Sequence, residues 1–204
     1  NQVTNSQTLQ FSVQSLDGSA RAGKLTFRNA EGPRKDALHG GADSDTSCIT
    51  ILTPVFMPVG TQATVKAIAQ PDLVEIGYQL ILGNTYHLYL RPGSDLIDGF
   101  GGIHKFMAWP HAVLTDSGGY QAFSLSDNVK LTDEGVKFRS HLDGSEHYFT
   151  PANTMRIERE IGADIIMPID DCAPFPADDK RLKESLVRTH RWLAECKNAW
   201  LQDP

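Results

Sequence analysis

Short apolar runs that end abruptly in polar residues constrain the fold of this chain more than any other feature. Leu80–Leu82 leads to Asn84, Ala112–Leu114 leads to Asp116, and residues 164–169 lead to Asp170. Each run is short enough to be a buried strand, and stretches with helical character lie between them. Repeated strands and helices with polar residues at the strand ends are typical of a (β/α) barrel or a doubly wound parallel sheet.

The number of strand–helix units favours part of a barrel. A closed eight-unit barrel needs about 250 residues, whereas this chain has 204, and its first unit begins with a strand at Val55–Val59. We count four units and expect the front half of a TIM-type (β/α) barrel over residues 51–204. Residues 1–50 are expected to form an antiparallel β lead-in, with strand-like alternation from Gln10 to Asn29 and a variable loop from Ala30 to Thr46.

Further elements follow from local signals. Helices are expected at residues 64–77, with a break at Pro71, and at residues 94–106. Thr150 and Pro151 form a strong helix start, and that helix should end near Gly162. Residues 129–149 alternate and contain turn sequences, so we expect an inserted β-hairpin. The last helix, at about 179–201, has a 4-3-4-3-4 spacing that predicts one buried stripe: Leu182, Leu186, Thr189, Leu193, Cys196 and Trp200.

Composition and charge narrow the class of protein. With 40% hydrophobic and 22% charged residues, the chain is ordinary for a globular protein, and no window approaches the roughly 18 apolar residues of a membrane span. A net charge of −6 disfavours a broad nucleic-acid-binding face. The three cysteines (Cys48, Cys172 and Cys196) lack CxxC spacing, which favours neither a disulfide framework nor a zinc site. Together with the absence of a visible signal peptide, they favour the cytoplasm.

The longest polar motif follows the apolar run that begins at Ala112. It reads Asp116-Ser117-Gly118-Gly119-Tyr120-Gln121. A carboxylate at a strand end is placed to transfer a proton, the two glycines let a flat ligand approach the backbone, and Tyr120 offers a stacking face. A polar strand-to-loop turn explains the Asp-Ser-Gly-Gly part equally well.

A second carboxylate, Asp170, is expected on the same rim. Its two oxygens could accept the two adjacent donors of the Watson–Crick edge of guanine and would reject adenine. Asp170 could instead cap the next segment or form an ion pair, Asp171 could face away, and Cys172 could be a small buried hydrophobe.

His87 could contact a ligand or be a hydrogen-bonded structural residue. There is no His-x-His or His-x-x-x-His motif, so no metal site is expected in this chain.

Six motifs in order carry a resemblance to a known family. They are Phe56–Thr61, Ile81–Leu88, Arg91–Gly93, Leu114–Leu125, Phe138–Gly144 and Asp170–Pro176. From about Ala20 onward the chain resembles the front half of a bacterial-type tRNA-guanine transglycosylase (queuine tRNA-ribosyltransferase). The loop from Ala30 to Thr46 is longer than the turn usual there, and the second half of the barrel has no counterpart in these 204 residues.

The resemblance implies an enzyme of queuosine biosynthesis, a pentosyltransferase that acts on tRNA. Such enzymes exchange the anticodon wobble guanine for a 7-deazaguanine base, either 7-aminomethyl-7-deazaguanine or queuine, by double displacement through a covalent enzyme–RNA intermediate. The implied partners are tRNA, the 7-deazaguanine base and a second copy of the protein, because the family often dimerises. The target base must leave its stack to enter a deep pocket.

The resemblance also implies roles for particular residues. Asp116 is the proton-transfer carboxylate, and Asp170 recognises the base. Ser117, Gly118, Gly119 and Tyr120 complete the base pocket, with Gln121 and Cys172 nearby. The family's nucleophilic aspartate, its zinc ligands and much of its tRNA surface belong to the second half of the barrel, so this segment alone is not expected to complete the reaction.

Two alternatives remain open at this point. A non-catalytic family member could bind tRNA or a catalytic partner, although the presence of both Asp116 and Asp170 favours catalysis. An unrelated barrel enzyme that acts on a small phosphorylated substrate would fit only the Gly118-Gly119 pair. The sequence does not decide which 7-deazaguanine base is incorporated, and the oligomeric state also stays open.

Overall fold

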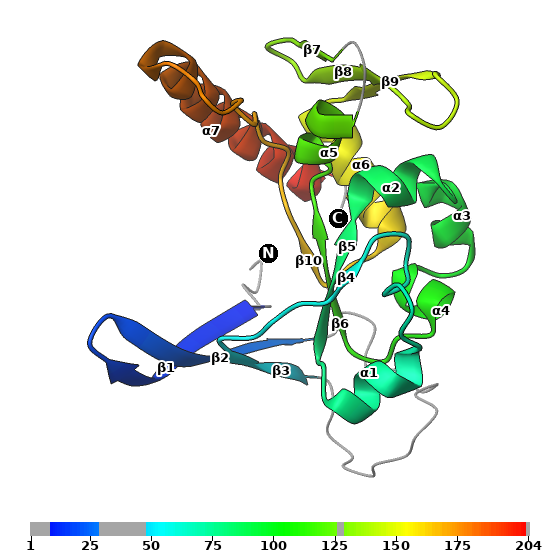
Figure 1. Cartoon of the computed structure of the whole chain (residues 1–204), viewed down its shortest axis with the longest axis vertical. Coiled ribbons are helices and arrows are strands. Elements are labelled where there is room, and N and C mark those ends of the chain that lie inside the picture. The colour runs from blue at the N-terminus through cyan, green and yellow to red at the C-terminus, as the bar shows by residue number, and fades with distance from the viewer. Residues whose placement is uncertain (1–8, 29–47, 126–128, 203–204) are drawn as a thin grey trace, which may run out of the picture.

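A four-stranded parallel β-sheet lies at the centre of the molecule (Figure 1), in a computed structural model that describes residues 9–28, 48–125 and 129–202. The strands lie in the order β4-β5-β6-β10, so sheet neighbours are also successive parallel strands along the chain. Their bounds are β4 (Val59–Gly60), β5 (Leu80–Asn84), β6 (Ala112–Asp116) and β10 (Ile165–Ile166). The predicted α/β architecture with a parallel sheet is confirmed.

Parallel pairing aligns the carboxyl ends of the strands. Asn84 at the end of β5 pairs with Asp116 at the end of β6, and Thr115 pairs with Ile166 of β10. The two inner strands, β5 and β6, have the bounds that the apolar runs and the polar residues after them predicted. This register, rather than any loop, brings the polar strand ends together.

The two outer parallel strands are shorter than predicted. Strands were expected at Val55–Val59 and at residues 164–169, but β4 covers only Val59–Gly60 and β10 only Ile165–Ile166. Each pairs with one parallel neighbour in the described part of the chain. In both cases the pairing ends before the partner strand does, because β5 continues to Asn84 and β6 to Asp116. The remaining apolar residues therefore continue outside the regular pairing.

Helices connect and cover the parallel strands. Within the described residues they are α1 (Gln70–Ile76), α2 (Thr85–Leu90), α3 (Ser94–Gly99), α4 (Ile103–Met107), α5 (Gly119–Leu125), α6 (Pro151–Ile161) and α7 (Asp179–Gln202). The predicted α6 is confirmed with its caps: the Thr150 hydroxyl accepts a hydrogen bond from the Asn153 N–H at 3.2 Å, and Gly162 ends the helix in the left-handed region.

Two helix predictions were wrong in extent, and the backbone shows why. The helix expected at 64–77 begins only at Gln70, because Ala63 and Ala67 before it have positive φ angles. The helix expected at 94–106 is two short helices, since Gly101 and Gly102 separate them with φ angles of 84° and 89°. Such angles cannot continue a right-handed helix. The sequence analysis also missed α2 and α5.

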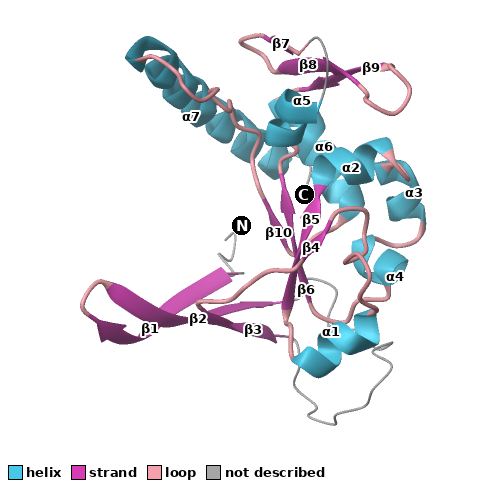
Figure 2. Cartoon of the chain, viewed as in Figure 1, coloured by secondary structure: helices cyan, strands magenta, loops and turns pink. Residues whose placement is uncertain are grey.

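Two antiparallel sheets lie at opposite ends of the parallel sheet (Figure 2). The first contains β1 (Leu9–Asp17), β2 (Ala20–Arg28) and β3 (Cys48–Thr53). The second contains β7 (Lys130–Leu131), β8 (Val136–Arg139) and β9 (Glu146–Phe149). The predicted lead-in hairpin is confirmed, and the predicted insertion forms three strands rather than a single hairpin. The loop prediction for Ala30–Thr46 lies outside the described residues.

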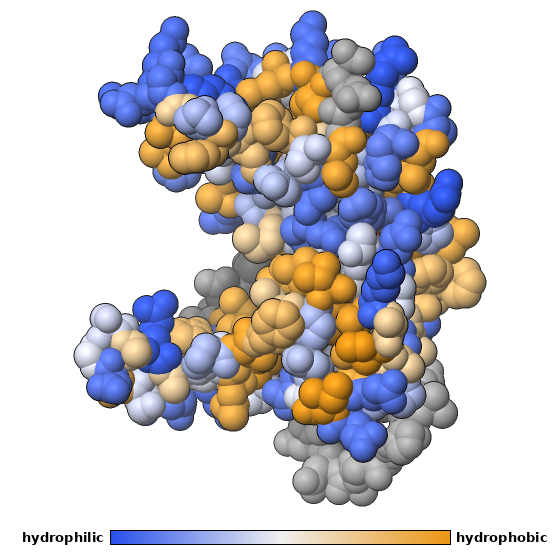
Figure 3. Space-filling model, in the orientation of Figure 1, coloured by the Kyte–Doolittle hydropathy of each residue, from blue (hydrophilic) through white to orange (hydrophobic). Residues whose placement is uncertain are grey.

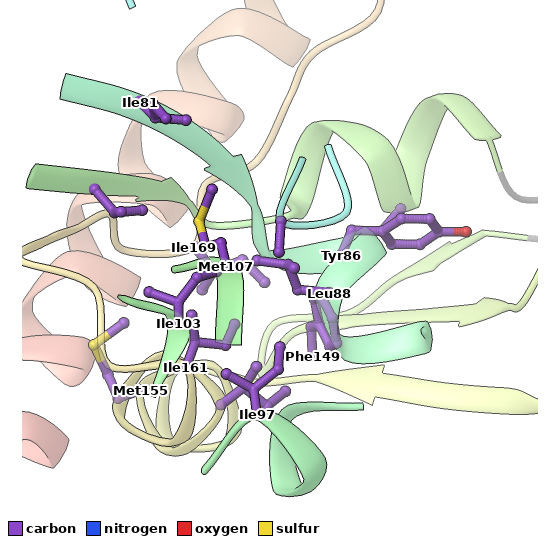
Figure 4. Close-up of a cluster of buried hydrophobic side chains, with 14 of the residues drawn as sticks. Ile81, Tyr86, Leu88, Ile97, Ile103, Met107, Phe149, Met155, Ile161 and Ile169 are labelled. Atoms are coloured by element: carbon purple, nitrogen blue, oxygen red, sulfur yellow. The ribbon is translucent and has the colours of Figure 1, made fainter. Parts of the chain in front are cut away.

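The main hydrophobic core fills the space between the parallel sheet and helices α2, α3, α4 and α6 (Figure 4). Ile81 of β5, Ile97 of α3, Ile103 of α4 and Ile161 of α6 are all fully buried there. A smaller cluster joins Phe27 and the lead-in sheet to the first residues of β5 and β6. The smaller core therefore packs the lead-in sheet against the first residues of β5 and β6, and the main core packs the helices against the parallel sheet.

Helix α7 buries only part of the predicted stripe. Of that stripe, Leu182, Leu186 and Leu193 are exposed, and Cys196 is buried as predicted. Trp192, which lies outside the predicted stripe, is also buried. The inward positions of the amino-terminal half are occupied by polar side chains that bind the segment after β10, as described below. Spacing alone cannot reveal this choice, because both faces of the helix carry apolar residues.

Exposed apolar side chains gather on the lead-in sheet and on the segment before β4. They border the hollow between the lead-in sheet and α7 that the space-filling view shows (Figure 3). Leu9 and Phe11 of β1 are exposed, as are Phe56 before β4 and Val59 of β4. Leu52 of β3 is exposed on the opposite face of the lead-in sheet from Leu9 and Phe11. In the part of the chain that the structure describes, no helix is long and apolar enough to cross a membrane.

Candidate functional site

The carboxyl ends of β5 and β6 and the segment after β10 meet at one edge of the parallel sheet. Asp116 is the last residue of β6, and Asp170 follows β10 by four positions. The Ser117 hydroxyl donates a hydrogen bond to Asp170 Oδ1 at 3.2 Å, which links the two predicted site carboxylates through adjacent residues. The prediction that Asp116 and Asp170 share a rim therefore agrees with the geometry.

Asp116 is surrounded by donors. Its Oδ1 accepts from the Thr85 N–H at 3.1 Å and from the Gly118 N–H at 3.0 Å. Its Oδ2 accepts from the side-chain amides of Asn84 and, at 3.1 Å, Gln121. A carboxylate offers about four acceptor positions, so protein groups occupy all of them in this conformation. A ligand that contacts Asp116 must replace one of these donors, and half-buried Gln121 is a side chain that can move.

Asp170 has fewer protein partners. Its Oδ1 accepts from Ser117, and its Oδ2 accepts from the Cys172 thiol at 3.2 Å. Among the described ion pairs none involves Asp170. Both oxygens therefore retain acceptor capacity, which a ligand with two adjacent donors could use. This geometry fits a recognition site better than the alternative in which Asp170 is an ion-pair partner.

Asp171 is an anchor for α7. Its buried carboxylate accepts hydrogen bonds from the guanidinium groups of Arg181, at 2.8 Å to Oδ2, and Arg188. Its backbone N–H donates to the Thr189 hydroxyl at 3.0 Å, and its carbonyl accepts from Ser185. These contacts turn polar residues of α7 inward and explain why the predicted leucine stripe is exposed.

The two glycines permit close packing of the backbone at the site. Gly118 has a φ angle of 74°, and a Cβ there would lie 2.8 Å from the Tyr86 nitrogen. A Cβ on Gly119 would lie 3.0 Å from Asp170 Oδ1. Their N–H groups donate to Asp116 and Ser117 and so hold the loop, and the approach of a flat ligand to these glycines stays a prediction. A side chain at Gly118 would press against Tyr86 in a strained backbone conformation, and one at Gly119 would press against Asp170.

Tyr120 and Cys172 differ in what they offer. The Tyr120 side chain is 62% exposed and leaves its ring free to stack. Burial and the neighbouring Asp170 carboxylate, which accepts the thiol hydrogen, raise the pKa of Cys172 to about 12. The thiol is therefore neutral at physiological pH and is not a nucleophile. Cys172, Asp170 and Phe123 line a small pocket between α5 and β8.

His87 lies beside the site within an aromatic group. Its ring packs edge-on against Tyr86 and His141, with centroids 5.2 and 5.9 Å apart. The Tyr86 hydroxyl is hydrogen-bonded to His141 Nδ1 at 2.8 Å. Burial, and then the charge of His141, lower the pKa of His87. The packing favours the structural interpretation of His87 over a ligand contact.

The sequence analysis missed Thr85, Thr115 and Glu158, which lie directly beneath the site. Glu158 of α6 is fully buried and accepts hydrogen bonds from both threonine hydroxyls. The sequence did contain a pattern that could have identified Glu158 as a buried acidic residue. Glu158 falls at i+4 from Thr154 and three positions before Ile161, on the apolar face of a predicted helix, where an acidic residue is unusual.

The described residues offer no cluster for a metal ion. Across residues 9–28, 48–125 and 129–202, no group of three or more His, Cys, Asp or Glu side chains could hold one. The zinc that the resemblance implies therefore does not fit the residues described, and no chemistry at this site is derived from it.

Comparison with known proteins gives consistent matches. The profile of a family described as Queuine tRNA-ribosyltransferase matches residues 17–204. A queuine tRNA-ribosyltransferase of Leptospira biflexa is 52% identical over 160 residues, which is 78% of this chain and 43% of the relative. One of Caldanaerobacter subterraneus is 58% identical over 149 residues (73% and 40%), and one of Koribacter versatilis is 48% identical over 195 residues (96% and 46%). The chain thus spans less than half the length of these relatives.

Proposed function

The chain belongs to the queuine tRNA-ribosyltransferase family, and from that premise we propose that it forms the base-recognition part of an enzyme that exchanges a guanine of tRNA for a 7-deazaguanine base. The exchanged guanine is the anticodon wobble base. The incoming base is 7-aminomethyl-7-deazaguanine or queuine. The parallel sheet is then the first part of a TIM-type barrel, and the site lies at the carboxyl ends of its strands, where such barrels carry their active sites.

The exchange consists of two displacements at the anomeric carbon of the ribose. An enzyme carboxylate attacks this carbon, the bond to guanine N9 breaks, and the departing guanine takes up a proton. The deazaguanine then attacks the same carbon, gives up its own N9 proton and releases the carboxylate. The family resemblance places the attacking aspartate outside these 204 residues. Asp116 is the carboxylate that exchanges protons with the two bases, which general acid–base catalysis requires within hydrogen-bond reach.

Asp170 selects the base. Guanine and 7-deazaguanine both present two adjacent N–H donors, and the two Asp170 oxygens accept both in a charge-assisted pair. Adenine presents an acceptor at the corresponding ring nitrogen and is rejected. Tyr120 stacks on the ring of the base, and the base replaces Gln121 as a hydrogen-bond partner of Asp116. Ser117 and Cys172 orient Asp170 through their hydrogen bonds to its carboxylate. Ser117, Gly118 and Gly119 set the spacing between the carboxylates.

Other parts of the enzyme supply the remaining requirements. The tRNA body needs basic surface that a chain of net charge −6 does not provide broadly. A second copy of the protein is the expected partner. The base itself should bind to Asp116 and Asp170 without the tRNA and without the second copy of the protein.

The link from Asp116 through Ser117 to Asp170 is the observation that carries the proposal. The test is calorimetric titration of guanine and 7-aminomethyl-7-deazaguanine into the wild type and Asp170→Ala. Two donors left buried and unpaired cost about 2–5 kcal/mol, so affinity should fall roughly 30- to 5000-fold. The melting temperature should change little. Unchanged affinity in a folded Asp170→Ala variant would remove Asp170 from the base site and the proposal with it.

A further inference from the structure

A buried carboxyl group connects the two inner strands beneath the site. Glu158 Oε1 accepts a hydrogen bond from the Thr85 hydroxyl at 2.9 Å, and Oε2 accepts from the Thr115 hydroxyl at 2.6 Å. Thr85 follows the last residue of β5, and Thr115 is the last residue but one of β6. Glu158 itself comes from α6, and its side chain has no exposure to solvent. A single side chain of α6 is thus hydrogen-bonded to the carboxyl ends of two strands.

Both threonines lead directly to Asp116. The Thr85 N–H donates to Asp116 Oδ1 at 3.1 Å, so the residue that binds Glu158 with its hydroxyl binds Asp116 with its backbone. Thr115 is covalently joined to Asp116. A rotation of either threonine would change the direction in which Asp116 presents its carboxylate. Glu158 therefore acts on Asp116 by two separate routes.

We propose that Glu158 is the positioning residue for Asp116. It fixes Thr85 and Thr115 against α6 and so sets the orientation of the proton-transfer carboxylate without contacting the substrate. The inference deepens the proposed function and rests on it for its catalytic meaning. The geometric part, that Glu158 orients Asp116, holds independently of which reaction the site performs.

The same arrangement makes Glu158 a neutral acid at physiological pH. Burial raises its pKa to about 8, against the lowering effect of the two threonine hydroxyls, and the Asp116 charge adds to the rise. In the neutral acid one of the two threonine contacts is reversed: the protonated oxygen donates to a threonine hydroxyl, and the other oxygen still accepts. An amide has the same pattern. Glu158→Gln should therefore preserve the arrangement, and Glu158→Leu should remove it.

Other titratable groups near this network respond at different pH values. Burial, and then the charge of His141, lower the pKa of His87 below its ordinary value of 6.5, and the charge of Asp116 opposes this lowering. Burial raises the pKa of Cys196 of α7 above its ordinary 9.0, and the charges of Glu195 and Glu158 add to the rise. A change at Asp116 near pH 8 that disappears in Glu158→Gln is therefore assignable to Glu158.

The test follows Asp116 directly in the full chain. The carboxyl carbon of Asp116 is observed by 13C NMR with labelled aspartate and is assigned by its loss in Asp116→Asn. Hydrogen exchange of the Thr85 amide reports the bond that this group donates to Asp116. The variants are Glu158→Gln, Glu158→Leu and, as a control that loosens the core of the same helix, Ile157→Val. Base exchange by the full-length protein is measured in parallel.

Glu158→Leu should shift the Asp116 resonance, accelerate Thr85 exchange about tenfold or more and reduce base exchange roughly tenfold to a hundredfold. Glu158→Gln should match the wild type at pH 7, and Ile157→Val should lower only the melting temperature. Unchanged Asp116 and Thr85 signals in a folded Glu158→Leu variant would overturn the inference.

A pH titration keeps the inference falsifiable if Glu158→Leu does not fold. The wild-type Asp116 resonance should show a step near pH 8 that Glu158→Gln lacks, and a wild type without that step would also overturn the inference. If the Asp116 effects appear but the wild type exchanges no base, the proposed function fails and the positioning role stands.

Discussion

The contact between Asp171 and α7 gives a stability prediction that can be worked from the structure. In Asp171→Ala the two guanidinium groups of Arg181 and Arg188 lose their shared carboxylate, whose side chain is 2% exposed. Breaking a fully buried ion pair costs about 3–5 kcal/mol. The arginine side chains are 24% and 18% exposed, so each can turn partly toward water. We therefore expect a loss of about 2–3 kcal/mol, a large part of a typical domain's stability.

Urea denaturation of the wild type, Asp171→Ala and Asp170→Ala measures this loss. The adjacent residue is the matched control, because Asp170 lacks the arginine partners of Asp171. The midpoint should fall clearly in Asp171→Ala with an unchanged slope, and much less in Asp170→Ala. A fall below about 0.5 kcal/mol in Asp171→Ala, the range of ordinary surface substitutions, would refute the reasoning. Asp171 would then not anchor α7.

Three further predictions follow from the site. Asp116→Asn should reduce base exchange by the full-length protein by about 10²- to 10⁴-fold, because an amide cannot take the proton and opposes the surrounding donors; a near wild-type rate would refute the role. Cys172 should resist iodoacetamide at pH 8 in the folded state, because its pKa is raised to about 12, and rapid alkylation would contradict this. Glu158 keeps a proton in the folded state that the unfolded chain releases above its ordinary pKa of 4.5. The stability of the wild type relative to Glu158→Gln should therefore fall as pH rises from about 4.5 through about 8 in denaturation curves, and parallel curves would contradict it.

The parts of the fold that could be predicted from sequence are those in which local signals and burial agree. The strands β5 and β6 are apolar, lie between neighbours on both sides and end at polar residues, so their bounds were found. The same holds for α6, whose caps at Thr150 and Gly162 coincide with the ends of its apolar pattern. The edge strands β4 and β10 were overestimated, because pairing depends on a neighbour that composition does not show.

The two carboxylates of the site could be predicted from the sequence, but the residues that hydrogen-bond to Asp116 and hold it in position could not. Asp116 and Asp170 stand at strand ends, where sequence order alone implies a shared rim. The saturation of Asp116 by four donors depends on register and on α2, which was not predicted. Glu158 belongs to the helix layer, 42 positions after Asp116, and only packing shows that it meets Thr85 and Thr115.

A crystal structure of the protein with 7-aminomethyl-7-deazaguanine tests the central claim most directly. The claim is that Asp116 and Asp170 form one base site. The account predicts that the base lies between them, with its two adjacent donors on the Asp170 oxygens, its ring against Tyr120 and Gln121 displaced from Asp116. A base bound elsewhere, or bound with Asp170 still paired only to Ser117 and Cys172, would contradict it.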